Sequence, residues 1–148
     1  MTTYSVDIHL ATSPEETFAY VSDLTRHGEW SADPLEIEPL SPDPIAAGKE
    51  YRSAAQVRGQ TIQATLRVTE VSSPSRFAFA VEDVTGKYDH LFTFHPEQGG
   101  TRVKRSITAQ LSLGQRLFFY FVYPFVKRPN AQEALRRLKN KLEQSRTT

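Results

Sequence analysis

The sequence predicts an α+β domain in which one curved antiparallel β-sheet wraps around a long C-terminal helix. Three observations lead to this fold class: segments of alternating apolar and polar residues, short turn sequences between them, and one amphipathic stretch near the C-terminus. Short connections make successive strands antiparallel, and only the C-terminal helix is long enough to cover such a sheet. This is the helix-grip arrangement, and the 148 residues fit a single domain over residues 1–148.

The N-terminal part is predicted to form one strand and two short helices. Residues 4–10 alternate apolar and polar side chains, which is typical of a strand with one buried face. Ser13 is a suitable N-cap and Pro14 suits the first helical turn, so a helix is predicted to begin here and end near residues 22–23. A second short helical turn over residues 24–29 leads to Trp30.

The middle of the chain is predicted to be a meander of strands. Residues 33–48 are rich in proline, and residues 35–38 within them suit a short edge strand, because proline is tolerated at sheet edges. Turn-like residues then separate strand candidates at residues 50–58, 61–71, 76–83, 88–95 and 101–111.

The C-terminal part is predicted to be helical over residues 114–143, with a break between Pro124 and Pro129, since each proline removes a helical hydrogen bond. Its second half has Arg and Lys on one face and apolar residues on the other: Ala131, Ala134, Leu135, Leu138 and Leu142. Residues 117–123 are apolar nearly all round. They are predicted to be a buried helix face, and a patch that contacts a membrane or a partner is the alternative.

This order of elements predicts a cavity. A sheet of five or six strands twists and curls, and a single helix does not fill the hollow of a strongly curved sheet. The short helices after the first strand would close one end of that hollow. Aromatic side chains could fill the space instead, because 11% of the residues are aromatic.

Several short motifs resemble a known superfamily. Residues 14–24, followed by His27 and Trp30, are similar to the opening of START-related, Bet v 1-like (SRPBCC) proteins, which include proteins labelled polyketide cyclase/dehydrase. Further similar segments follow in order at residues 47–51, 68–71, 92–94, 99–103 and 135–139. The resemblance covers nearly the whole chain and implies the helix-grip fold. It implies no single activity, because members bind lipids, polyketides, sterols or hormones and only some catalyse.

Strand alternation supplies the candidate ligand contacts. Tyr88, His90, Phe92 and Phe94 share one strand face, and so do Val103, Arg105, Ile107 and Ala109. If these faces point inward, His90 and Arg105 are polar groups in an apolar cavity that would orient a ligand carbonyl, carboxylate or phenol. Alternatively, His90 is a core histidine and Arg105 extends to the rim. The predicted pocket residues are Trp30, Tyr51, Phe79, His90, Phe92, Arg105, Ile107, Phe118 and Phe121.

No catalytic residue, metal or cofactor is predicted. The chain has no cysteine, which excludes disulfides and thiolate chemistry. His90 and His95 point to opposite strand faces, so they do not share a metal. His27 follows Asp23 at helical spacing without a third ligand, and a surface salt contact is predicted there. Phosphate-binding glycine loops and the Gly-x-Ser-x-Gly elbow are both missing from the sequence.

Charge is unevenly distributed although the net charge is only +1. Acidic residues predominate over residues 1–50 and basic residues over residues 127–148, which favours a solvated C-terminal helix near the acidic N-terminal part; a basic face for phosphate or anionic lipid is the alternative. Exposed aromatics do not interleave with the bases, so no nucleic-acid partner is predicted. The sequence shows no signal peptide and no apolar run of about 18 residues, so we expect a cytoplasmic protein without stable membrane insertion.

Three functions follow as hypotheses. The leading one is a non-catalytic binder or carrier of a small apolar, lipid- or polyketide-like molecule between sheet and C-terminal helix. The first alternative is a polyketide cyclase or dehydratase, for which His90 and Arg105 would converge near a further acid or hydroxyl. The second is an interaction module that uses the basic C-terminal helix. A homodimer through the edge strand at residues 35–38, or through the aromatic block near Phe118, is also compatible with the sequence.

Overall fold

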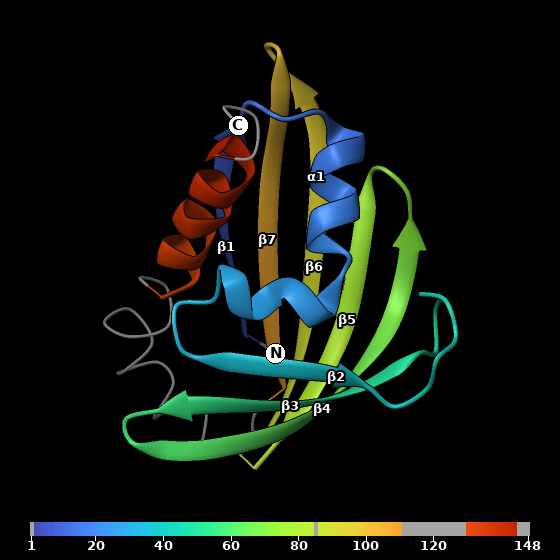
Figure 1. Ribbon diagram of the computed structural model, residues 1–148, viewed down its shortest axis with the longest axis vertical. Coiled ribbons are helices and arrows are strands. Elements are labelled where there is room, and N and C mark those ends of the chain that lie inside the picture. The colour runs from blue at the N-terminus through green and yellow to red at the C-terminus, as the bar shows by residue number, and fades with distance from the viewer. Residues whose placement is uncertain (1, 85, 111–129, 145–148) are drawn as a thin grey trace.

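A computed structural model of the protein describes residues 2–84, 86–110 and 130–144. Figure 1 shows one strongly curved sheet with the helices gathered on a single face of it. This confirms the predicted helix-grip arrangement.

The sheet has seven strands in the order β1-β7-β6-β5-β4-β3-β2, and all neighbours are antiparallel. Consecutive strands from β2 to β7 are joined as the predicted meander, and β1 closes the other edge by pairing with β7. Most ends differ from the predicted ones by a residue or two. The strands are β1 (Thr2–Leu10), β2 (Leu35–Pro39), β3 (Glu50–Val57), β4 (Gln60–Ser72), β5 (Arg76–Asp83), β6 (Gly86–Glu97) and β7 (Gly100–Gln110).

Two short helices follow β1, as predicted. Helix α1 (Pro14–Val21) begins at Ser13, whose hydroxyl accepts the backbone N–H of Glu16 at 3.2 Å. Element η1 (Leu24–Glu29) is a 3₁₀-helix, and the Asp23 carboxylate accepts the backbone N–H of Thr25 at its start.

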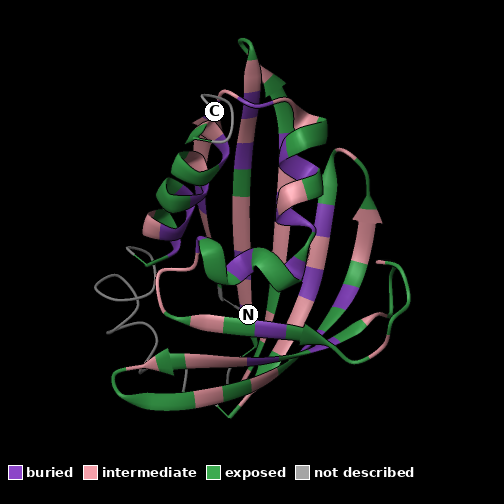
Figure 2. Ribbon diagram, viewed as in Figure 1, coloured by how far each residue is buried: buried purple, intermediate pink, exposed green. Residues whose placement is uncertain are grey.

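The C-terminal helix covers residues 130–144 in the described part of the chain. The rest of the predicted helix, over residues 114–129, lies outside the described residues together with the expected break between Pro124 and Pro129. The predicted apolar face is confirmed, because its five members are all buried: Ala131, Ala134, Leu135, Leu138 and Leu142. Figure 2 shows such buried positions on the sides of α1 and the C-terminal helix that turn toward the sheet.

Aromatic side chains dominate the core beneath α1. The Phe18 ring makes edge-to-face contacts with Phe94, at 5.5 Å between ring centroids, and with Phe77, at 6.4 Å. Such edge-to-face pairs add to the stabilisation gained from burial alone. The inward faces of β5 and β6 therefore form the floor on which α1 rests.

One glycine fixes how η1 lies against the sheet edge. A Cβ atom on Gly28 would lie 2.2 Å from the carbonyl oxygen of Leu35 in β2, so only glycine permits this approach. The close packing of η1 on β2 carries His27 and Trp30 over the concave face of the sheet.

Candidate functional site

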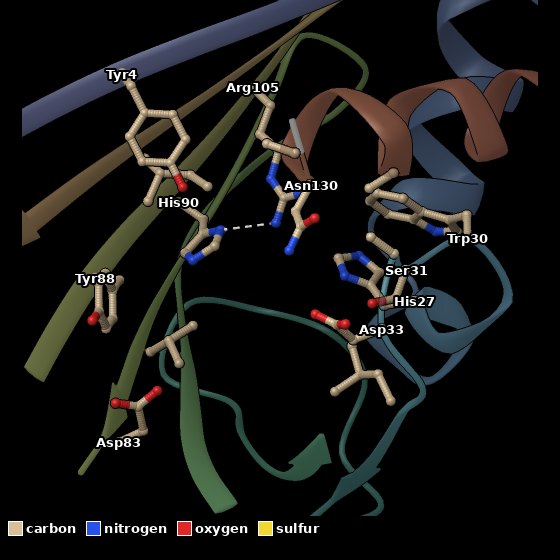
Figure 3. Close-up of a pocket in the computed structure, with 16 residues that line it drawn as sticks. Tyr4, His27, Trp30, Ser31, Asp33, Asp83, Tyr88, His90, Arg105 and Asn130 are labelled. Carbon is tan, nitrogen blue, oxygen red and sulfur yellow. Dashed lines mark hydrogen bonds between the residues drawn. The ribbon is translucent and has the colours of Figure 1, made fainter. Parts of the chain in front are cut away.

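A cavity of about 260 Å³ lies between the sheet, η1 and the first described turn of the C-terminal helix. Figure 3 shows His90, Arg105, Asn130, His27 and Asp33 around a common space. Strands β1, β5, β6 and β7, the segment from η1 to β2 and the C-terminal helix supply its described lining: Tyr4, His27, Trp30, Ser31, Ala32, Asp33, Leu35, Val81, Asp83, Tyr88, His90, Arg105, Ile107, Asn130, Ala131 and Ala134.

Arg105 extends from β7 across an aromatic floor. Its guanidinium carbon lies 5.3 Å from the ring centroid of Phe92 and 5.9 Å from that of Trp30. Phe92 is its register partner on β6, so strand pairing itself places the cation over a ring face. Burial lowers the pKa of Arg105 from its ordinary value, but a guanidinium stays protonated even so.

Arg105 contacts His90 directly. Its Nη2 donates to Nδ1 of His90 at 3.3 Å, as the dashed line in Figure 3 marks. The accepting Nδ1 carries no proton, so a neutral His90 carries its proton on Nε2. The His90 ring also stacks on Phe79 at 4.8 Å with an interplanar angle of 11°. This stacking holds the imidazole on the same wall as the guanidinium.

His27 lines the opposite side of the cavity and is buried. Its Nε2–H donates to the carbonyl oxygen of Val21 at 2.8 Å, and its ring lies 4.5 Å from that of Trp30. The pKa of His27 is lowered to about 4, mainly by burial. The hydrogen bond to Val21 raises the pKa, and the Arg105 cation lowers it further. His27 is therefore neutral at pH 7. The predicted surface contact with Asp23 is wrong, because Asp23 caps η1 while His27 turns inward.

The structure brings together four of the predicted pocket residues, namely Trp30, His90, Arg105 and Ile107, which all line the cavity. Phe79 and Phe92 lie beneath them and support His90, His27 and Arg105 through ring contacts. Tyr51 lies elsewhere, in a separate hollow beside α1 that also contains Ala19 and Ser22. Phe118 and Phe121 lie outside the described residues.

Sequence reasoning missed several of the lining residues. Tyr4 shares the alternating face of β1 with the buried Val6, so the strand pattern could have identified it. Asp33 and Ser31 lie in the loop before β2, and Asn130 lies at the start of the described helix. These three positions belong to no alternating face, and only the tertiary fold brings them to the cavity.

The basic residues of the C-terminal helix take part in local contacts. Arg136 and Arg137 both pair with Glu133, at 3.1 and 3.5 Å, and Lys139 pairs with Glu143 at 3.5 Å. Arg137 also donates to the carbonyl oxygen of Ser31 at 2.8 Å, which ties the helix to the loop that lines the cavity. Arg136, Arg137 and Lys139 of the basic face therefore make contacts within the protein that stabilise the C-terminal helix.

The described residues contain neither a metal-binding cluster nor a helix suited to a membrane. Over residues 2–84, 86–110 and 130–144, no three His, Asp or Glu side chains are grouped so that they could hold a metal ion. Within the same ranges, no helix combines the length and the apolar character that crossing a bilayer requires.

Comparison with known proteins agrees with the fold. A family model described as polyketide cyclase / dehydrase and lipid transport matches residues 1–143. The uncharacterised protein Rv1546 of Mycobacterium tuberculosis (strain ATCC 25618 / H37Rv) is 30% identical over 108 residues, which cover 72% of this chain and 73% of that protein.

Solved structures are similar over almost their full length. TTHA0849 from Thermus thermophilus has a TM-score of 0.77 at 19% identity, covering 97% of this chain and 99% of that one. A START superfamily protein from Mycobacterium smegmatis has a TM-score of 0.72 at 15% identity, with 96% and 97% covered. Ara h 8.0201, a Bet v 1 protein, has a TM-score of 0.70 at 11% identity, with 97% and 98% covered. The chain belongs to the polyketide cyclase / dehydrase and lipid transport family and has the START-related, Bet v 1-like helix-grip fold.

Proposed function

We propose that the protein binds a small, mainly apolar molecule in the cavity between sheet and C-terminal helix and leaves it chemically unchanged. The observation that carries this proposal is the cavity itself. Nine of its described lining residues are aromatic or aliphatic and seven are polar or charged, so the cavity offers a small molecule both apolar surface and hydrogen-bonding groups. The family description, which includes lipid transport, supports the same role.

The cavity volume limits the ligand. At about 260 Å³ the cavity is slightly smaller than sites that take drug-sized ligands, which measure roughly 300–1,000 Å³. Molecules with one or two rings, or with a short aliphatic chain, fit this volume better than a sterol. The aromatic walls favour a flat ring, because Trp30 and His90 both present ring systems to the cavity.

The first test is native mass spectrometry of the purified protein, followed by denaturation and identification of any released molecule. Isothermal titration with 2-naphthalenemethanol, a neutral two-ring probe, then measures uptake. Saturable one-to-one binding, or a retained apolar molecule that this probe displaces, supports the proposal. A protein that is empty as purified and takes up no apolar probe would contradict it.

A matched pair of variants locates the binding. Ala134→Leu places an isobutyl group into the cavity from the C-terminal helix, and Gln132→Leu adds the same group on the exposed side of that helix. Both substitutions preserve helix propensity. We expect Ala134→Leu to weaken probe binding at least about tenfold, which corresponds to about 1.4 kcal/mol, and Gln132→Leu to leave it unchanged. Equal effects of the two variants would place the bound probe elsewhere.

A second candidate function is cyclisation or dehydration of a polyketide-like substrate. The observation in its favour is that Arg105, His90 and the hydroxyl-bearing Tyr4 share one wall of the cavity (Figure 3). A guanidinium there could stabilise a developing enolate oxygen.

The protonation states favour binding over catalysis. Nδ1 of His90 is occupied as an acceptor for Arg105, and the pKa of His27, at about 4, makes it a weak base. The test is deuterium exchange at the methyl group of 2-acetonaphthone in D₂O, followed by NMR. We expect no acceleration. Saturable acceleration that is lost in both His90→Ala and Arg105→Met would establish the catalytic function instead.

A further inference from the structure

Arg105 is a cation within the fold that forms no ion pair with a carboxylate in the described part of the chain. All seventeen acidic residues of the chain fall within the described ranges, and none of them forms an ion pair with Arg105. Six other basic side chains do form such pairs, namely those of Arg26, Arg76, Arg102, Arg136, Arg137 and Lys139. Arg105 therefore differs from these basic residues in its lack of a carboxylate partner.

The hydrogen-bonding capacity of Arg105 is also largely unused. A guanidinium has five N–H donors, and in the described part of the chain one of its nitrogens, Nη2, donates to His90. The residue as a whole is half-buried because it borders the cavity, but its Nε is buried and has no hydrogen-bond partner among these residues. The faces of Phe92 and Trp30 stabilise the cation in part. A desolvated charge without an anionic partner is nevertheless costly, and a ligand that brings the anion would remove that cost.

We infer that the ligand of this site is an amphipathic monoanion, a small ring system or short chain that carries one carboxylate, and that Arg105 binds the carboxylate. This inference rests on the proposed binding function and specifies its ligand class. The planar guanidinium matches a carboxylate in geometry as well as in charge. Figure 3 shows the end of the Arg105 side chain directed into the cavity, where such a group would lie.

The charges around the cavity favour one negative charge over two. Arg105 is the one Lys or Arg side chain among the described residues that line the cavity, while Asp33 and Asp83 also line it. His27 adds no positive charge, because it is neutral at pH 7. A phosphate monoester would bring about two negative charges into a cavity lined by one cation and two carboxylates. A carboxylate brings one charge and matches the site better.

The experiment compares ligands that share one skeleton and differ in charge. Binding of 2-naphthoate, 2-naphthalenemethanol and 2-naphthyl phosphate is measured by isothermal titration at pH 7.5. For the unmodified protein we expect 2-naphthoate to bind at least about tenfold tighter than the alcohol, since hydrogen bonds to charged groups are the strong ones. The phosphate should bind more weakly than the carboxylate.

Two substitutions on β7 complete the test. Arg105→Met removes the cation of the cavity at similar side-chain length, and Lys104→Met removes an exposed cation from the other face of the same strand. We expect Arg105→Met to weaken 2-naphthoate binding at least about tenfold and 2-naphthalenemethanol binding much less, so that the preference for the acid over the alcohol is lost. Lys104→Met removes the same charge outside the cavity, and it should bind the three compounds as the unmodified protein does. A loss of 2-naphthoate binding in this control would point to an effect of net charge.

Failure of the inference is distinguishable from failure of the proposed function. If the unmodified protein binds the acid and the alcohol equally, the carboxylate assignment is overturned and the binding function stays intact. If Arg105→Met keeps the preference for the acid, the conclusion is the same. Tighter binding of the phosphate would overturn the single-charge assignment. If none of the three compounds binds, the binding function falls and the inference falls with it. The comparison in the unmodified protein decides the question even if Arg105→Met does not fold.

Discussion

The concave face of the sheet has two halves that differ in filling and polarity although the same strands build both. The packed half, beneath α1, contains Phe77, Phe94 and Val103, and all three are buried. The cavity half contains Tyr4, Tyr88, His90 and Arg105, which line an open volume of about 260 Å³. Phe92 and Arg105, paired in register, mark the boundary between the halves.

Strand alternation determines which side chains face inward, and the elements packed above the sheet determine whether the space there is filled. Along β6 the inward residues run from Phe94 through Phe92 and His90 to Tyr88, so the period of two decides which side chains face inward. It does not decide whether the space they face is filled. A helix covers and fills the packed half, where Phe18 contributes edge-to-face contacts. We therefore expect the packed half to contribute more to stability and the cavity half to make the proposed ligand contacts.

The largest expected effect tests the packed half. Phe94→Ala removes a ring that is 3% exposed and contacts Phe18, and should lower the free energy of unfolding by about 3–5 kcal/mol. Tyr88→Ala, on the same face of the same strand in the cavity half, should cost at most about 1 kcal/mol because that side chain is only half-buried. Urea unfolding measures both. Equal losses would show that the two halves contribute alike to stability.

The next effect concerns the buried histidine at the edge of the cavity. The pKa of His27 is about 4 in the folded protein, below its ordinary value near 6.5, so the unfolded chain binds a proton more readily. Stability should therefore be fully present above about pH 6.5 and fall by about 3 kcal/mol as the pH drops toward 4. Urea unfolding at a series of pH values measures this fall.

The contribution of His27 is isolated by a pair of variants. His27→Gln retains a side-chain N–H for the Val21 carbonyl and should unfold with a flatter pH dependence. His95→Gln, at an exposed position of β6, should keep the pH dependence of the unmodified protein. Parallel profiles for the His27→Gln variant and the unmodified protein would show that another group causes the loss at acid pH.

The smallest expected effect is the most informative about the cavity half. In the absence of ligand, Arg105→Met should change the free energy of unfolding by less than about 1 kcal/mol, because relief of the desolvated charge offsets the lost contacts with Phe92 and Trp30. Urea unfolding of the ligand-free protein measures it. A loss of about 3–5 kcal/mol is the signature of a broken buried ion pair, and would mean that Arg105 has a counter-ion within the protein.

Most of the fold could be predicted from the sequence because its signals are local. Alternation located the strands to within a residue or two, and Ser13 and Pro14 located the start of α1. The family-like segments agree with the order of elements that these patterns predict. Strand ends were less certain, because β6 continues through Tyr88 to Gly86 and through His95 to Glu97, where pairing with β5 and β7 overrides the turn-like residues.

The site was only partly predictable, because it depends on tertiary packing. Arg105 and His90 were identified by alternation, which is a property of single strands. Asp23 precedes His27 at α-helical spacing, and this predicts a surface contact for His27. Element η1 has three residues per turn, however, so positions four apart do not share a face. Tyr51 is buried as its strand pattern suggests, but the curvature of the sheet turns β3 toward α1 instead of the cavity.

The order of strands in the sheet also determines when the protein can finish folding during synthesis. Of the seven described strands, β1 leaves the ribosome before the others and its partner β7 after them, with Leu10 opposite Thr101 and Thr2 opposite Ala109. A nascent chain that ends before β7 leaves β1 and β6 with unpaired edges, the kind of surface that promotes aggregation. Pairing across so long a stretch of chain is slow, so we expect the wall that carries Tyr4 and Arg105 to be completed late.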